Sequence, residues 1–201
     1  MIKLSEQKYY SEDFWFNSMH LHEDNIEVNN YGKDYYGYKL IKRVALSLTD
    51  VPEDGYIVFL GSHNCNTFSL LIDKYGTDRC LGIDIANPSN NPCVKVKNIM
   101  NFDKSDDVPI SFVYNDLGSF VHTPVAKWKA QVWAANNVIP NGYFLGRNDF
   151  NTAKMPVESF MTRLGFINNH LLGIEGLLNT GLDFKTLEGH MLSKKCLPKF
   201  Y

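Results

Sequence analysis

The sequence predicts an α/β fold: a doubly wound, mostly parallel sheet with helices on both faces and an N-terminal helical extension. Three observations lead to this prediction. From Gly55 onward, short apolar runs alternate with helix-length segments, which is the pattern of βαβ units. The runs are apolar at nearly every position, as parallel strands buried on both faces are. Glycine and polar residues follow several runs, where such sheets bind ligands.

Five apolar runs are the expected strands. They are Tyr56 to Leu60, Cys80 to Ile85, Val94 to Val96, Ile110 to Tyr114 and Gly142 to Leu145. Two amphipathic segments between them, Thr67 to Tyr75 and Val125 to Ile139, suit crossover helices. A further short helix is expected over Val157 to Leu164, followed by a closing pair of strands at Phe166 to Ile174 and Gly189 to Ser193.

The extension before the first strand contains one periodic segment. Apolar residues recur at four-residue steps there, at Tyr36, Leu40, Val44 and Leu48. This spacing predicts an amphipathic helix that ends before Asp50. We expect residues 1–54 to form a helical arm or cap and residues 55–201 to form the ligand-binding domain, within one globular unit.

Composition narrows the functional classes. The 201 residues include 20 Lys and Arg against 22 Asp and Glu, a formal net charge of −2, and 44% are hydrophobic. A near-neutral chain without basic runs argues against a protein that coats nucleic acid. The apolar stretches are far shorter than the roughly 20 residues that span a bilayer, and no secretory signal is recognisable. We expect a cytoplasmic protein without membrane or nucleic-acid partners.

The four cysteines do not indicate a metal site or a disulfide framework. They are Cys65, Cys80, Cys93 and Cys196. No C-x-x-C pair occurs among them, and no histidine stands at metal-site spacing. We expect free thiols in a reducing compartment.

The loop after the first strand is the first candidate site. Gly61 permits a sharp turn and a close approach of backbone to ligand, and the helix that follows offers unpaired N–H groups. Asp84 ends the second strand at about the 20-residue spacing at which an acid accepts ribose hydroxyls in nucleotide-binding folds. Without a ligand, Gly61 would belong to an ordinary βα turn and Asp84 would be a helix cap or a surface acid.

The same loop disfavours dinucleotides and phosphate transfer. A G-x-G-x-x-G loop would need glycine where this chain has His63 and Asn66, whose side chains would crowd a pyrophosphate. No Gly-Lys-Ser/Thr sequence follows the strand, so the lysine of a phosphate-binding loop is missing.

From Gly55 to Phe150, the order of motifs resembles class I S-adenosylmethionine-dependent methyltransferases, which have a Rossmann-like fold. The loop from Gly61 to Cys65 looks like a degenerate form of their motif I, closest to the loops of FkbM-type enzymes. The resemblance implies S-adenosylmethionine as cofactor, with its methionine part at this loop, its ribose at Asp84 and its adenine at Asn98 to Asn101. The implied cofactor-binding residues are Gly61, Ser62, His63, Asn64, Cys65, Asp84, Ile85, Asn98 and Asn115.

The second half is similar to TylF-type and catechol-type O-methyltransferases, on two segments. Ile110 to Asp116 is an apolar strand ending in an acid, and Pro140 to Phe150 resembles their second strand end. The likeness implies that Asp116, Asn148 and Asp149 are oxygen ligands of a divalent cation such as Mg²⁺. It also implies methyl transfer from a sulfonium to a hydroxyl that the metal orients.

The expected catalytic residues are Asp116 and His122. His122 follows the fourth strand by a few residues and could act as a general base near neutral pH. As alternatives, Asp116 and Asp149 would be solvated acids at strand ends, and His122 an exposed loop histidine.

Three functional classes follow from these residues. The first is a methyltransferase acting on a hydroxyl of a small molecule or sugar, with a homodimer left open. The second is a non-catalytic module that keeps the methyltransferase fold without binding the cofactor. The third is a nucleotide-sugar enzyme on the same sheet, because a fold alone does not fix function.

Overall fold

The structure is a computed structural model that describes residues 36–62, 65–85, 87, 89–117, 124–147, 166–168 and 190–195. Its strands are β1 (Tyr56–Leu60), β2 (Cys80–Asp84), β3 (Val94–Val96), β4 (Ile110–Asn115), β5 (Val138–Arg147), β6 (Phe166–Asn168) and β7 (His190–Lys195). Its helices are α3 (Tyr36–Arg43), α4 (Cys65–Tyr75) and α5 (Pro124–Asn137). Three 3₁₀ turns accompany them: η3 (Ala45–Ser47), η4 (Ile99–Asn101) and η5 (Lys104–Asp106).

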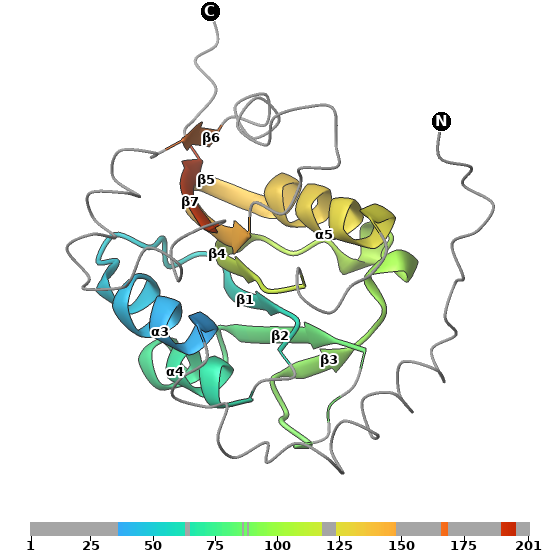
Figure 1. The fold of residues 1–201 in the computed structure, drawn as a ribbon, viewed down its shortest axis with the longest axis horizontal. Helices are drawn as coiled ribbons and strands as arrows, with labels where there is room; N and C mark the ends of the chain where they lie inside the picture. The colour runs from blue at the N-terminus through green and yellow to red at the C-terminus, as the bar shows by residue number, and fades with distance from the viewer. Residues whose placement is uncertain are drawn as a thin grey trace, which may run out of the picture.

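The strands form one seven-stranded sheet in the order β3-β2-β1-β4-β5-β7-β6 (Figure 1). The first five in this order are parallel to one another, whereas β7 runs antiparallel to both β5 and β6. The expected doubly wound, mostly parallel sheet is therefore confirmed, including the closing pair of strands. The strand order reverses between β1 and β4, and ligands bind at the carboxyl ends of the strands beside such a point.

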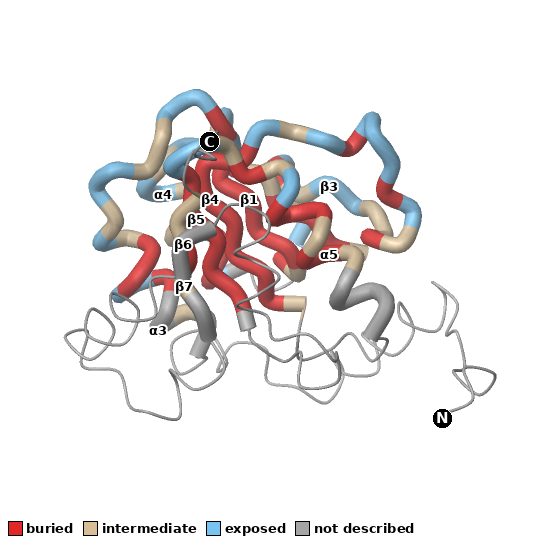
Figure 2. The backbone as a smooth tube through the Cα atoms, turned by 90° about the horizontal axis from the view of Figure 1, so that it is seen from above, coloured by how far each residue is buried: buried red, intermediate tan, exposed pale blue. Residues whose placement is uncertain are grey.

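Alternating side chains divide the core into two layers. Ile57 and Phe59 of β1 pack with α3 and α4 on one face, and Val58 and Leu60 pack with α5 on the other. This follows from the two-residue period of a strand, which sends successive side chains to opposite faces. Figure 1 shows α3 and α4 on one side of the sheet and α5 on the other, and Figure 2 shows the buried residues concentrated in the central strands.

Helix α3 packs against the same sheet. Its Ile41 is fully buried, and Val44 and Ala45 follow it into the core layer of α4. The expected helix is confirmed over Tyr36–Arg43 and continues through η3. The Nζ of Lys74 on α4 donates to the carbonyls of Leu46 and Leu48, 2.8 Å away in each case. The division of the chain at residue 54 stays a prediction.

The boundary between α5 and β5 differs from the expectation. The helix was expected to reach Ile139, and the strand to begin at Gly142, but the helix ends at Asn137 and the strand begins at Val138. Pro140 is the reason, because the residue before a proline is driven out of the helical region into extended backbone. Asn141 then takes a φ of +65°, and the pairing of β5 with β4 is irregular at this place.

Two further expectations concern a C-terminal helix and membrane-spanning segments. The short helix expected over Val157 to Leu164 lies outside the described residues. Among the helices within the described ranges, none is long and apolar enough to cross a membrane.

Cys80 and Cys93 are free and buried. Burial raises the pKa of Cys80 to about 12. Because the thiolate is the reactive form, this cysteine is inert at neutral pH.

Candidate functional site

The carboxyl ends of β1, β2 and β4 meet at the reversal point of the sheet. The N–H of Gly61, just after β1, donates to the carbonyl of Ile83 in β2 at 2.9 Å. The N–H of Asp116, just after β4, donates to the carbonyl of Leu60 in β1 at 3.0 Å. These two bonds place the turns after β1 and β4 beside each other and beside Asp84.

Gly61 makes the turn that closes β1. Its φ of +81° lies in the left-handed region that favours glycine. A Cβ at this position would also lie 3.3 Å from Cδ2 of Leu117 and 3.4 Å from the carbonyl carbon of Asp116. The expected sharp turn is confirmed for this residue, and its close approach to a cofactor stays a prediction.

The Ser62 side chain points away from a ligand position and into the core. Its Oγ would lie 2.7 Å from a Cβ built on Gly82, and the same Cβ would lie 2.9 Å from Cε1 of Phe68. Ser62 is 1% exposed, and within the described part of the chain its Oγ has no hydrogen-bond partner. The Ser62 hydroxyl therefore packs inside the core, and a role of this residue toward a cofactor stays a prediction.

Asp84 ends β2 with a buried carboxylate. One of its oxygens, Oδ1, accepts the N–H of Ile85 at 2.7 Å, and its carbonyl accepts the N–H of Lys97 at 2.8 Å. A carboxylate has acceptor sites for several donors, which is the chemistry that ribose hydroxyls require. Ile85 itself is half-buried beside it.

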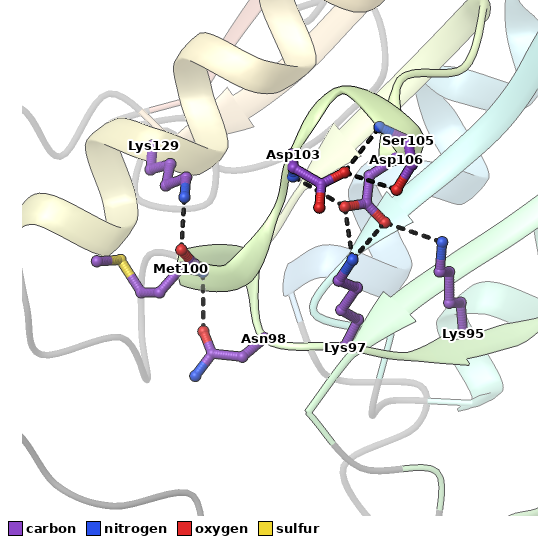
Figure 3. Close-up of polar contacts among 8 residues, drawn as sticks. All are labelled: Lys95, Lys97, Asn98, Met100, Asp103, Ser105, Asp106 and Lys129. Carbon is purple, nitrogen blue, oxygen red and sulfur yellow. Dashed lines mark hydrogen bonds and ion pairs between the residues drawn. The ribbon is translucent and has the colours of Figure 1, made fainter.

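Asn98 precedes η4, at the segment expected to contact adenine. Its Oδ1 accepts the N–H of Met100 at 2.9 Å, so the side chain caps its own turn, and its amide nitrogen points away from the turn in Figure 3. The Nζ of Lys129 on α5 donates to the carbonyl of Met100 (Figure 3). The η4 turn is thus fixed from within and from the neighbouring helix.

The buried carboxylate of Asp106 holds the segment between β3 and η5 in place. Asp106 accepts hydrogen bonds from the Nζ of Lys97 at 2.7 Å, the Nζ of Lys95 at 3.0 Å and the N–H of Asp103 at 2.9 Å (Figure 3). Burial alone would raise the pKa of Asp106, but these three donors outweigh it and hold the pKa well below its ordinary range. The cluster ties β3 to η5 and so supports the segment between them.

Asn115 ends β4 and Asp116 directly follows it, and both are buried. The Nδ2 of Asn115 donates to Oε1 of Gln131 on α5 at 3.4 Å, and its Oδ1 accepts the N–H of Leu117 at 3.3 Å. The structure therefore brings together Gly61, Asp84 and the Asn115–Asp116 pair at one edge of the sheet.

Lys129 and Gln131 were missed from the sequence. Gln131 is the one buried polar residue in the described part of α5, between Ala130 and Val132. In the sequence, the only signal was a glutamine among apolar positions of the helix. That signal does not indicate that its side chain contacts the end of β4.

Several expected site residues lie outside the description. They are His63, Asn64, His122, Asn148 and Asp149. Cys65 begins α4, but its side chain is not described. Among the residues whose positions are described, no group of three His, Cys, Asp or Glu could hold a metal ion. The expected ligand set is represented there by Asp116 alone.

Comparisons with known protein families and with curated proteins find no match. Solved structures do show similarity. One is the complex between the Haloferax volcanii Trm112 methyltransferase activator and the putative methyltransferase. The match covers 92% of this chain and 97% of the matched chain, at 12% identity and a TM-score of 0.53. A second match is a putative sarcosine dimethylglycine methyltransferase from Galdieria sulphuraria. It covers 93% of this chain and 99% of the matched chain, at 13% identity and a TM-score of 0.48.

DesVI of Streptomyces venezuelae matches 69% of this chain at 13% identity and a TM-score of 0.42, and the match spans 57% of DesVI. The Haloferax likeness, over nearly the whole of both chains, shows that this chain shares its fold with that putative methyltransferase. The expected Rossmann-like α/β architecture is confirmed, and the closer likeness to TylF-type and catechol-type enzymes stays a prediction.

Proposed function

We propose that this chain is an S-adenosylmethionine-dependent methyltransferase whose cofactor binds at the carboxyl ends of β1, β2 and β4. One observation carries the proposal: the strand ends bring Gly61, Asp84 and Asn115 together at the reversal point of a methyltransferase-fold sheet. Ligands of doubly wound sheets bind at this point.

The residues present suit such a cofactor. Gly61 allows the turn after β1 to lie close against the turn after β4, and glycine has no side chain that would obstruct a ligand at this turn. The Asp84 carboxylate suits the two hydroxyls of a ribose. The cofactor, when bound, supplies a methyl group on a sulfonium sulfur, and the task of the chain is to bind and orient the two reactants.

The finer part of the proposal is transfer to a hydroxyl of a small molecule or sugar, assisted by Mg²⁺. Asp116 supports it as a buried acid at the end of β4, and Asn148, Asp149 and His122 belong to it through the sequence likeness alone. Transfer to hydroxylated acceptors should then require Mg²⁺ and stop on chelation. Full activity in a chelator would refute the metal while leaving the methyltransferase proposal intact.

Titration calorimetry with S-adenosylhomocysteine tests the main proposal. We expect wild type to bind, and Asp84→Ala to bind about ten-fold more weakly or worse, because hydrogen bonds to a charged group are lost. Asp73→Ala, an exposed acid on α4, is the matched control and should bind like wild type. Equal affinity of Asp84→Ala and wild type would contradict the ribose assignment.

A non-catalytic module is the second candidate, favoured by the degenerate motif-I loop, which has His63 and Cys65 where methyltransferases often have glycine. The Haloferax structure pairs a methyltransferase with an activator protein, so a protein partner for this chain is also part of this second proposal. Failure of wild type to bind S-adenosylhomocysteine at millimolar concentration would favour it.

A further inference from the structure

We propose that Gln131 is a positioning residue for the cofactor site: it orients the Asn115 amide and, through it, the turn that contains Asp116. The inference rests on the proposed function. It concerns a residue that touches no ligand and acts through its neighbour.

The orientation of the Asn115 amide is set at both ends. Its Nδ2 donates to Oε1 of Gln131 at 3.4 Å, and its Oδ1 accepts the N–H of Leu117 at 3.3 Å. A rotated amide would place NH₂ against the Leu117 N–H, donor against donor. The Leu117 N–H therefore requires the oxygen of Asn115 to face the turn, and the Gln131 acceptor holds the Asn115 NH₂ on the opposite side in that arrangement.

That turn is then held on both sides of Asp116. Its own N–H donates to the carbonyl of Leu60 in β1, at 3.0 Å, and the next N–H along the chain is held by Asn115. The Gly61 turn packs directly against the Asp116 and Leu117 backbone. A change in the Asn115 amide would therefore reach both turns that border the proposed cofactor position.

Packing alone does not explain an amide at position 131. Gln131 is 1% exposed, and its helix neighbours Ala130, Trp133 and Ala134 belong to the apolar layer under the sheet. An apolar residue would fill such a position without the cost of burying a polar group. Lys129, two residues earlier, contacts the Met100 carbonyl, so α5 contacts both the segment after β3 and the last residue of β4.

The test compares Gln131→Met with Gln131→Glu in the full-length chain, with Asn136→Met as control. Methionine keeps the length of the side chain without the acceptor, glutamate keeps an acceptor for Asn115, and Asn136 is exposed on the same helix. Two quantities are measured: the Kd for S-adenosylhomocysteine, and the ¹H–¹⁵N signals of the Asn115 side-chain amide.

We expect Gln131→Met to weaken binding about ten-fold, as the loss of one buried hydrogen bond does, and to shift the Asn115 signals. Gln131→Glu keeps the acceptor but buries a carboxylate, so its Asn115 signals should stay near those of wild type although its Tm falls, and Asn136→Met should resemble wild type in Kd, signals and Tm. A lower Tm with unchanged Kd in Gln131→Met would overturn the inference, because a purely structural role predicts that result.

The two proposals fail in different ways. Failure of wild type to bind S-adenosylhomocysteine refutes the proposed function, whatever Gln131 does. The orientation of Asn115 is then decided by its amide signals alone, and unchanged signals in Gln131→Met would overturn it.

Discussion

At the residue scale, the side chain of Ser62 fills the space that a side chain at Gly82 would need. A Cβ on Gly82 would lie 2.7 Å from Oγ and 2.9 Å from Cβ of Ser62, closer than such atoms approach one another. Ser62 also buries a hydroxyl for which the described residues offer no partner. The contact therefore serves packing between β2 and the turn after β1.

Gly82→Ala should lower the free energy of unfolding by about 1–3 kcal/mol, the usual cost of overpacking a core. Ser62→Gly in the same chain should restore part of it, because both crowding Ser62 atoms are removed. Urea denaturation of the two single variants and the double variant measures this coupling. Strictly additive effects would show that Ser62 is not the obstacle.

Asp106 gives the molecule a pH-dependent contribution to stability. Burial raises the pKa of this carboxyl, but the three hydrogen-bond donors lower it more. The pKa in the folded state therefore lies below the ordinary 3.8. Such a group stabilises the fold above its unfolded pKa, and the contribution is lost as pH falls toward the folded value.

Asp106→Asn should therefore lower the free energy of unfolding by about 2 kcal/mol at pH 7, since hydrogen bonds to a charged group are weakened. The difference from wild type should be constant between about pH 6 and 7 and shrink below about pH 4. Asp107→Asn, an exposed neighbour, is the control. A difference that persists undiminished at pH 3 would contradict the assignment.

The spacing of Gly61 and Asp84 was visible in the sequence because both sit at strand ends, which apolar runs mark. The inward direction of Ser62 and the contact of Gln131 with Asn115 were not visible. Both depend on which strands are neighbours and in what register, and a single strand pattern does not contain that information.

At the element scale, the connection before β1 is tied to the far strands of the sheet. The hydroxyl of Tyr143 in β5 donates to Oδ1 of Asp50 at 2.6 Å, and the Nζ of Lys194 in β7 donates to Oδ2. Asp50 is largely exposed, so its ion pair contributes little. The buried Tyr143 is the effective member of the contact.

Tyr143→Phe should lower the Tm by about 2–4 °C, since one hydrogen bond of about 1 kcal/mol is lost from a chain of this size. Tyr56→Phe, at the exposed start of β1, should leave the Tm unchanged. Thermal unfolding followed by circular dichroism compares them. Equal Tm values for wild type and Tyr143→Phe would show that the Asp50 contact does not stabilise the fold.

The sequence predicted which elements exist better than where they end. The strand at Tyr56–Leu60 was predicted to the residue, because its apolar run is bounded by Gly55 and Gly61. The end of α5 was placed two residues late, because Ile139 continues the helical apolar pattern although Pro140 excludes it from the helix.

At the scale of the whole molecule, the alternation of strands and helices was sufficient to predict a doubly wound parallel sheet. It did not predict that β7 lies between β5 and β6. Two strands that pair with each other could add to the sheet in either order. The carboxyl edge could be predicted as the site because the position of ligands follows from topology. The arrangement of the turn at Asp116 could not be predicted, because it depends on the contact between Asn115 and Gln131 of α5.

The central claim is that the cofactor lies at the carboxyl ends of β1, β2 and β4, and a crystal structure of the protein grown with S-adenosylhomocysteine tests it most directly. The account predicts density between the Gly61 turn and Asn115, with the ribose hydroxyls within hydrogen-bonding distance of the Asp84 carboxylate. Ligand density elsewhere, or none at a concentration that saturates the titration, would contradict it.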